Sequence, residues 1–140
     1  MTVTFIGHRD ALPSLAPELK ALLIRLIEEE NADCFYVGNE GDFDRIAQKI
    51  LAELSVRNPK IRCFTVLAYL PRTGTTPSPL ETIYPEGLES VPRRFAIWKR
   101  NQWMLTHADT LVCHVLFSGS NSAKLMEKAR RSGKRVINLR

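Results

Sequence analysis

The chain has 140 residues, of which 44% are hydrophobic and 25% charged, and its formal net charge is +5. This composition is typical of one globular domain and excludes a wholly disordered chain, because disordered sequences are poorer in apolar residues. No apolar run is long enough to cross a bilayer, and the first residues lack the basic and apolar regions of a secretory signal, so we expect a cytoplasmic protein without a membrane span.

Short apolar runs alternate with helical patterns in the first half of the chain. Residues 3–6 predict a first strand, and the large apolar residues between positions 15 and 27 recur at helical spacing, which predicts a helix beginning near Pro17. A second strand at residues 34–37 leads into a second helical stripe between positions 43 and 54, which Asn58 and Pro59 end. A third strand is predicted at residues 61–67.

The next segment departs from this alternation. It is rich in proline and contains the sequences Thr-Gly-Thr-Thr and Tyr-Pro-Glu-Gly, so we expect an irregular loop excursion over residues 70–92, of a kind that is often functional. A third helix is predicted from about Pro92 to His107 and a fourth strand over residues 110–116. A fourth helix that Gly133 ends and a last strand at residues 136–139 complete the chain.

The predicted strands are nearly continuous apolar runs, which is typical of a parallel sheet covered by helices on both faces. Right-handed crossovers then predict an α/β fold: a single doubly wound Rossmann-like domain over residues 1–140, with a mostly parallel five-stranded sheet of order 3-2-1-4-5. Cys34, Cys63 and Cys113 lie in these strands without a CxxC or Cys/His pair, so we expect reduced core thiols and no metal site.

In such sheets, ligands bind at the carboxyl ends of the strands, where the winding direction reverses. Three predicted loops at that edge contain glycine and polar residues, at positions 7–10, 38–42 and 118–122. Any turn favours these residue types for conformational and capping reasons, but three such loops beside helix amino ends favour a phosphate site. The candidate binding residues are Gly7, His8, Arg9, Gly38, Asn39, Glu40, Gly41, Asp44, Arg100, Asn101, Ser118, Gly119, Ser120 and Asn121.

Several charged residues and histidines have two interpretations. Arg9 either clamps an anion with its planar guanidinium or is a solvated loop charge. His8 either contacts the ligand, as a donor or general acid, or caps its loop, and we favour contact with the ligand. His107 and His114 lie at a helix end and within a strand, so we expect structural contacts for both.

The sequence RRFAIWKRNQW mixes cations with aromatic residues on the third predicted helix. This pattern can bind single-stranded nucleic acid by stacking, and the positive net charge would support it. We favour the alternative of a partly buried helix, in which Phe95 and Trp103 pack on neighbouring elements and the charges face water. Arg100 and Asn101 reach the ligand edge if the helix begins there.

The sequences GHR, GNEGDFDRIA, RNQWMLTHAD and SGSNSAKLMEKARRSGKRVINL resemble the SLOG superfamily, the Rossmann-like group that contains the DprA/Smf and Lonely Guy proteins. The resemblance covers residues 3–139 and is closest to the small YpsA-like members. It places Asp44 at the acidic position of a glycine-rich turn, Ser118 to Ser120 at a phosphate-facing turn, and Arg100-Asn101 at an Arg-Lys or Arg-Asn motif. It implies a nucleotide-type ligand.

The catalytic motif of the Lonely Guy hydrolases, PGGxGTxxE, is not present, and Glu127 lies further along its helix than the motif's glutamate would. Binding or sensing of a nucleotide or nucleotide-derived phosphorylated ligand is therefore the favoured function. One alternative is N-glycosidic hydrolysis of a nucleoside monophosphate, with Glu40 or Asp44 as the carboxylate. Another is single-stranded DNA binding, as in DprA. Related domains often pair through helices, so a homodimer is a possible partner arrangement.

Overall fold

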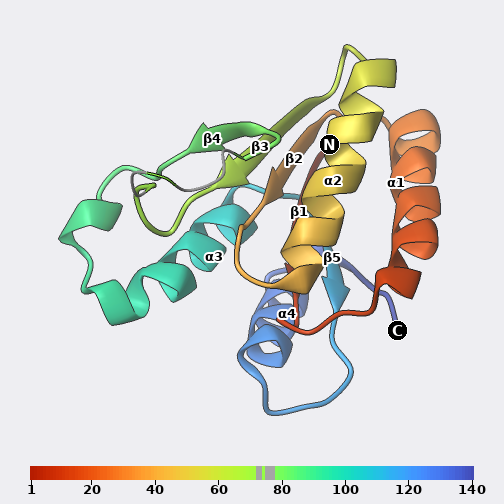
Figure 1. Cartoon of the computed structure of the whole chain (residues 1–140). Coiled ribbons are helices and arrows are strands. Elements are labelled where there is room, and N and C mark those ends of the chain that lie inside the picture. Colours follow the sequence, from red (N-terminus) through yellow and green to blue (C-terminus); the bar gives the residue numbers. More distant parts are fainter. Residues whose placement is uncertain (72–73, 75–77) are drawn as a thin grey trace.

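A computed structural model describes residues 1–71, 74 and 78–140 (Figure 1). In the described part of the chain, the strands form one parallel sheet of six, in the order β4-β3-β2-β1-β5-β6. Their bounds are β1 Thr2–Gly7, β2 Cys34–Val37, β3 Arg62–Val66, β4 Glu81–Ile83, β5 Thr110–His114 and β6 Arg135–Asn138. The predicted α/β Rossmann-like domain and the order of its five expected strands are confirmed.

The predicted number of strands is wrong, because β4 lies inside the segment expected to be irregular. It continues the sheet beyond β3, where Phe64 pairs with Glu81 and Val66 pairs with Ile83. This edge strand has only three residues, two of them exposed, so it lacks the apolar run that marks the other strands. The Thr-Gly-Thr-Thr sequence of the expected excursion lies, apart from Gly74, outside the described residues.

Among the residues described, four α-helices cover the sheet: α1 Ala16–Glu30, α2 Asp42–Arg57, α3 Ala96–Thr106 and α4 Asn121–Arg131. Helices α1 and α2 pack on one face, while α3 and α4 pack on the other (Figure 1). In β1, Phe5 belongs to the first of these cores and Ile6 to the second. Burial on both faces explains the continuous apolar runs of β1 and β5.

The third helix begins later than expected. The segment after β4 contains two 3-10 turns, Leu88–Ser90 and Arg93–Phe95, and α3 starts only at Ala96. Trp103 packs against Tyr36 with ring centroids 5.1 Å apart, as expected. The expectation for Phe95 is wrong, because this side chain precedes the helix and is 48% exposed.

Cys34, Cys63 and Cys113 carry free thiols, as predicted, although Cys34 and Cys63 are only half-buried. Burial raises the pKa of Cys63 and of Cys113 to about 12, so both thiols stay protonated at neutral pH. Within the described residues, no helix has the length and apolar character that a bilayer span requires.

The winding direction of the sheet reverses at β1. This strand pairs with β2 on one side and with β5 on the other. The chain leaves β1 toward α1 on one face and leaves β5 toward α4 on the opposite face, so the carboxyl ends of β1 and β5 form the topological switch point.

Candidate functional site

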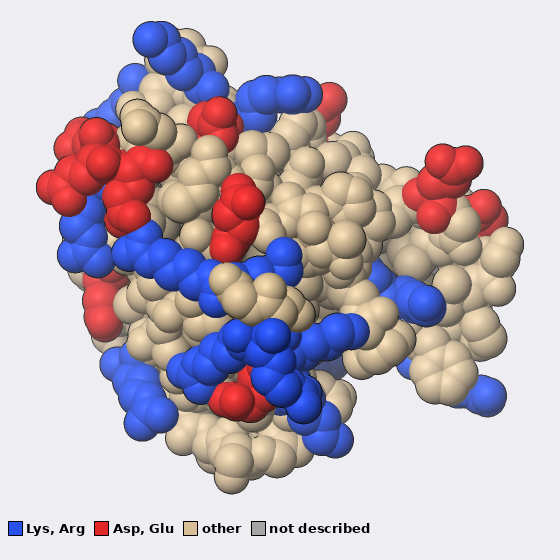
Figure 2. Space-filling model, turned by 180° about the vertical axis from the view of Figure 1, so that it is seen from behind, with Lys and Arg blue, Asp and Glu red and all other residues tan. Residues whose placement is uncertain are grey.

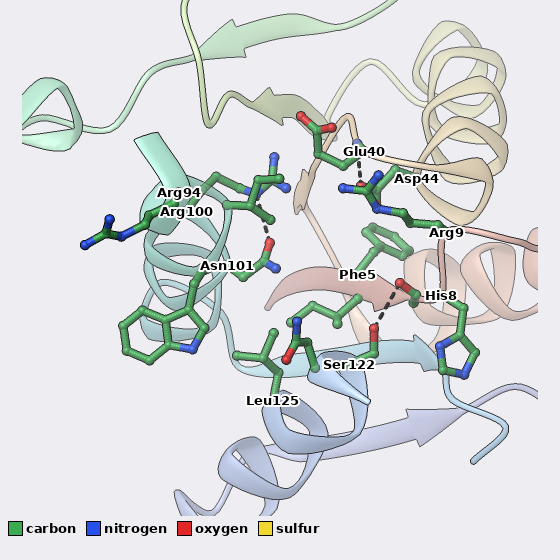
Figure 3. Close-up of a pocket in the computed structure, with 15 residues that line it drawn as sticks. Phe5, His8, Arg9, Glu40, Asp44, Arg94, Arg100, Asn101, Ser122 and Leu125 are labelled. Carbon is green, nitrogen blue, oxygen red and sulfur yellow. Dashed lines mark hydrogen bonds between the residues drawn. The ribbon is translucent and has the colours of Figure 1, made fainter. Parts of the chain in front are cut away.

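A cavity of about 420 Å³ lies at this switch point (Figure 3). Loop residues after β1 and β2 form one side, and α3 and the amino end of α4 close the other. The lining residues are Phe5, Ile6, Gly7, His8, Arg9, Glu40, Asp44, Arg94, Ile97, Trp98, Arg100, Asn101, Asn121, Ser122 and Leu125. Eight of them belong to the set of fourteen that the sequence selected: Gly7, His8, Arg9, Glu40, Asp44, Arg100, Asn101 and Asn121.

The loop after β1 is tied to its neighbours through its backbone. A side chain at Gly7 would collide with the Phe43 ring, so glycine allows the end of β1 to pack closely on α2. Gly7 O accepts a hydrogen bond from Ser122 Oγ at 3.1 Å, which joins this loop to α4. Arg9 O accepts one from Asp42 N at 2.6 Å. Arg9 therefore lies at the cavity on a fixed backbone.

The glycines of the loop after β2 also have packing roles. A Cβ at Gly38 would lie 2.8 Å from Asp44 Oδ2 and 2.9 Å from Arg100 Cζ, so this glycine lets both charged groups approach the backbone. Gly41 has a φ of 96°, and a Cβ there would lie 2.7 Å from Arg9 Cα. Gly38 and Gly41 thus place other residues of the cavity and do not line it themselves.

Arg100 is a buried cation, with a side chain that is only 1% exposed. Its Nη1 donates to Val66 O at 2.9 Å and to Asn39 Oδ1 at 3.3 Å, and its Nε donates to Asn101 Oδ1 at 2.8 Å. Among the described residues, every fully buried polar side-chain atom has a hydrogen-bond partner. Arg100 also lines the cavity, and its three hydrogen bonds leave its Nη2 unused.

Asp44 and Glu40 add carboxylates to the same cavity. Burial raises the pKa of Asp44 to about 6, against the opposing effects of the Arg100 charge and of the Glu40 N–H. That N–H donates to Asp44 Oδ2 at 2.9 Å. Glu40 itself is half-buried at the cavity. Asp44 is therefore an acid that changes protonation close to neutral pH, beside a second carboxylate that is partly exposed.

The loop before α4 has two separate positions. Ser120 caps the helix, because its Oγ accepts a hydrogen bond from Ala123 N at 3.0 Å. Asn121 and Ser122 form the first turn and line the cavity, whereas Ser118 and Gly119 line a different hollow on the far side of the loop. Ser118, Gly119 and Ser120, which the resemblance placed at a phosphate-facing turn, are therefore not among the residues that line the cavity.

Sequence reasoning missed three lining residues on and before α3, namely Arg94, Ile97 and Trp98. Arg94 is exposed and Trp98 is 49% exposed, with Lys128 Nζ 5.5 Å from the Trp98 ring. The signal was present, because positions 94, 97, 98 and 101 have the three-and-four spacing of one helical face. Of these four positions, the sequence assigns only Asn101 to the ligand site.

His8 lines the cavity, but its ring contacts the loop after β5. Its Nε2 accepts a hydrogen bond from Leu116 N at 2.9 Å, and the ring stacks on Phe117 with centroids 4.4 Å apart. Burial and the nearby His114 lower the pKa of His8. The loop-cap interpretation therefore describes its observed contacts.

The other two histidines make the structural contacts that the sequence suggests. His114 Nδ1 donates to Leu139 O at 2.8 Å, and His107 Nδ1 donates to Trp103 O at 2.7 Å. Within the part of the chain that the structure describes, no group of three or more His, Cys, Asp or Glu side chains is placed to hold a metal.

No protein-family model and no curated protein matches the chain. Among solved structures, it is similar to DNA processing protein A (DprA) from Streptococcus pneumoniae, with a TM-score of 0.70 and 16% identity over 98% of this chain and 49% of that one. It is also similar to DprA from Helicobacter pylori, in a study of that protein's single-stranded DNA binding mode, with a TM-score of 0.65 and 18% identity over 100% of this chain and 65% of that one.

The chain therefore spans 49% of the length of the first of these chains and 65% of the second. At such identities the likeness establishes the fold alone. The fold is the Rossmann-like α/β fold that these DprA structures also have.

Proposed function

We propose that the cavity binds a nucleotide or a nucleotide-derived phosphorylated ligand, as expected of a small YpsA-like member of the SLOG superfamily. The observation that carries this proposal is the placement of Arg9, Arg94 and Arg100 around one cavity together with the amino end of α4. Arginine binds phosphate oxygens through paired donors, and the first N–H groups of a helix have no partner within it. Both features favour an anion at this position.

The rest of the cavity suits the other parts of a nucleotide. Ile97 and the half-exposed Trp98 provide an apolar surface on which a base can pack. Glu40 can accept hydrogen bonds from sugar hydroxyl or base N–H groups. The volume of about 420 Å³ lies within the range of small-ligand sites. Because burial keeps Asp44 partly protonated near its pKa of about 6, it offsets less of the arginine charge.

Thermal unfolding with added ligands tests the proposal. The panel contains nucleoside mono-, di- and triphosphates, the unphosphorylated nucleosides and inorganic phosphate. A ligand present at about 100 times its Kd stabilises the folded state by about 2.7 kcal/mol, which raises Tm by several degrees. We expect phosphorylated ligands to raise Tm more than their nucleosides. A panel in which no phosphorylated compound changes Tm would contradict binding.

A second candidate, hydrolysis of the N-glycosidic bond, is favoured by the two carboxylates of the cavity. In such a reaction, water adds its oxygen to the anomeric carbon and loses a proton to one carboxylate, Glu40, as the bond to the base breaks. The departing base takes a proton from the other, Asp44, whose pKa of about 6 leaves part of it protonated at neutral pH. Chromatography of monophosphates incubated with the protein would detect free base. Release that Glu40→Gln abolishes supports this candidate, and no release despite binding rejects it.

Single-stranded DNA binding is the remaining alternative, and the basic surface over α4 is the observation that favours it (Figure 2). It predicts that affinity for an oligonucleotide falls steeply as salt rises. Affinity that is absent, or that does not change with salt, would count against this alternative.

A further inference from the structure

A second hollow lies on the other side of the β5–α4 loop and is here called the groove. It has a volume of about 460 Å³, and its residues do not overlap with those of the cavity. Val115 and Met126 form a buried apolar floor. At the rim, Leu116 is 53% exposed and Phe117 is 61% exposed, and both rank among the exposed large hydrophobic residues of the described chain.

The groove is surrounded by positive charge. Lys124, Arg130, Arg131 and Arg140 line it, and Figure 2 shows how Lys and Arg side chains gather over α4. Among its described lining residues the acidic one is Glu127, which forms an ion pair with Arg130 at 2.7 Å. The other three cations are not among the ion pairs of the described residues. They are available to a negatively charged partner.

The exposed apolar side chains belong to a loop that is held in place. Leu116 N donates to His8 Nε2, and the Phe117 ring stacks on the His8 ring with an interplanar angle of 7°. Val115 is fixed on both sides by Asn138, whose Oδ1 accepts from Val115 N at 2.9 Å and whose Nδ2 donates to Val115 O at 3.0 Å. A partner therefore meets an ordered surface, which reduces the entropy lost on binding.

We infer that the groove is a docking site for an acidic segment of a partner protein, with an apolar side chain seated between Leu116 and Phe117 and carboxylates facing Lys124 and Arg131. Charge complementarity selects the acidic segment. The shape of the apolar part favours a peptide over a nucleic acid. One face of the Phe117 ring is already covered by His8, and the remaining apolar lining is aliphatic and not a flat stacking platform.

Fluorescence anisotropy with labelled peptides tests this inference on the full chain. The probe contains the sequence Glu-Glu-Leu-Phe-Glu-Glu, and two comparison peptides replace either all Glu with Gln or Leu-Phe with Ser-Ser. We expect the probe to bind, and we expect the Kd of each comparison peptide to be higher than that of the probe by about tenfold or more. No binding of the probe, or equal binding of all three peptides, would overturn the inference.

Charge reversal locates the site. The variant Lys124→Glu with Arg131→Glu removes two groove cations and should raise the Kd of the probe by about tenfold. The matched control, Lys60→Glu with Arg57→Glu, makes the same change in net charge. Lys60 and Arg57 are both exposed, and Arg57 lies in the last turn of α2. This control should bind the probe with the Kd of the unaltered chain. An equal loss in both variants would overturn the inference, since it would reflect net charge alone.

A second variant and a second ligand complete the test. Phe117→Ser keeps every charge. It should weaken binding of the probe and leave binding of the Ser-Ser peptide unchanged. An oligodeoxythymidine is titrated in parallel. Suppose that the oligodeoxythymidine binds, that it loses affinity in the variant with Lys124→Glu and Arg131→Glu, and that the peptide probe does not bind. The groove would then be a nucleic-acid surface, and the inference would be wrong. Circular dichroism and thermal unfolding confirm that each variant is folded.

Discussion

The cavity and the groove lie on opposite sides of one loop, and both contain arginine, yet their charges are arranged differently. In the cavity, Arg100 is buried and fixed by hydrogen bonds to three groups, so only one of its nitrogens is left for a ligand. In the groove, Lys124 and Arg131 are exposed on the surface of a helix. A fixed, buried donor suits the recognition of one small anion, while exposed cations suit an extended acidic surface.

Arg100→Leu should have the largest effect, because it breaks the fixed arrangement of the cavity. It removes the hydrogen bond from Arg100 to Val66 O and the cation that most favours the charged form of the buried Asp44 carboxyl group. Loss of one partner from such a network destabilises a protein by about 3–5 kcal/mol. Denaturant unfolding measures this change. Arg94→Leu removes an exposed arginine of the same cavity and should change stability by less than about 0.5 kcal/mol.

The pH dependence of stability should follow from Asp44. Its pKa is about 6 when folded and about 3.9 in a model peptide, so the folded state binds the extra proton between these values. The contribution of Asp44 to the free energy of unfolding therefore falls by up to about 3 kcal/mol as pH rises from about 4 to 6, and it is fully lost above pH 6. Unfolding at several pH values compares the chain with Asp44→Asn, which should lack this fall. Parallel curves for the two proteins would show that Asp44 ionises normally.

Arg9→Ala should raise the Kd of one ligand, the compound that gives the largest thermal shift. The increase should be about ten- to a hundredfold, because one charge-assisted contact is lost. Arg9 is exposed, so the fold should be unchanged. Arg57→Ala is the matched control, because Arg57 is also an exposed arginine. It lies in the last turn of α2, at the opposite end of the helix from the cavity. Calorimetric titration measures both, and equal affinities would place the ligand elsewhere.

The smallest effect is expected for the contact between the two regions. His8→Ala removes the acceptor of Leu116 N and the ring that stacks on Phe117, and so it loosens the rim of the groove. The Kd of the acidic peptide should rise by about threefold, which corresponds to one modest hydrogen bond. His8→Phe keeps the stacking and should recover part of the loss. If His8→Ala leaves peptide affinity unchanged, then the loop is ordered without His8.

Hydrophobic patterning predicted most of the fold, because each buried strand is an apolar run and right-handed crossovers restrict the order of parallel strands. The edge strand β4 escaped this reasoning, since an exposed three-residue strand depends on pairing with β3 and not on its own sequence. Loop positions in the cavity were predictable from topology. The position of Trp98 at the cavity was not, because the direction of a helical face is set by how α3 packs on the sheet.

The glycines show a second limit of sequence reasoning. Gly7 and Gly38 are suited to close approach by a ligand oxygen, but in the structure their missing side chains make room for Phe43 and for the Asp44 and Arg100 groups. Ser118 and Gly119 illustrate the same point, since the turn into α4 places them on the groove side of the loop. Composition identified the right edge of the sheet, and tertiary packing decided which residues face the cavity.

Titration of the isotopically labelled chain with a nucleoside monophosphate, followed by backbone amide NMR, tests the phosphate site most directly. The account predicts that the largest chemical-shift changes occur at Arg9, Asn121 and Ser122, around the cavity, while Gly119 and Lys124 in the groove change little. Changes confined to the groove, or no changes at ligand concentrations that saturate ordinary nucleotide sites, would contradict it.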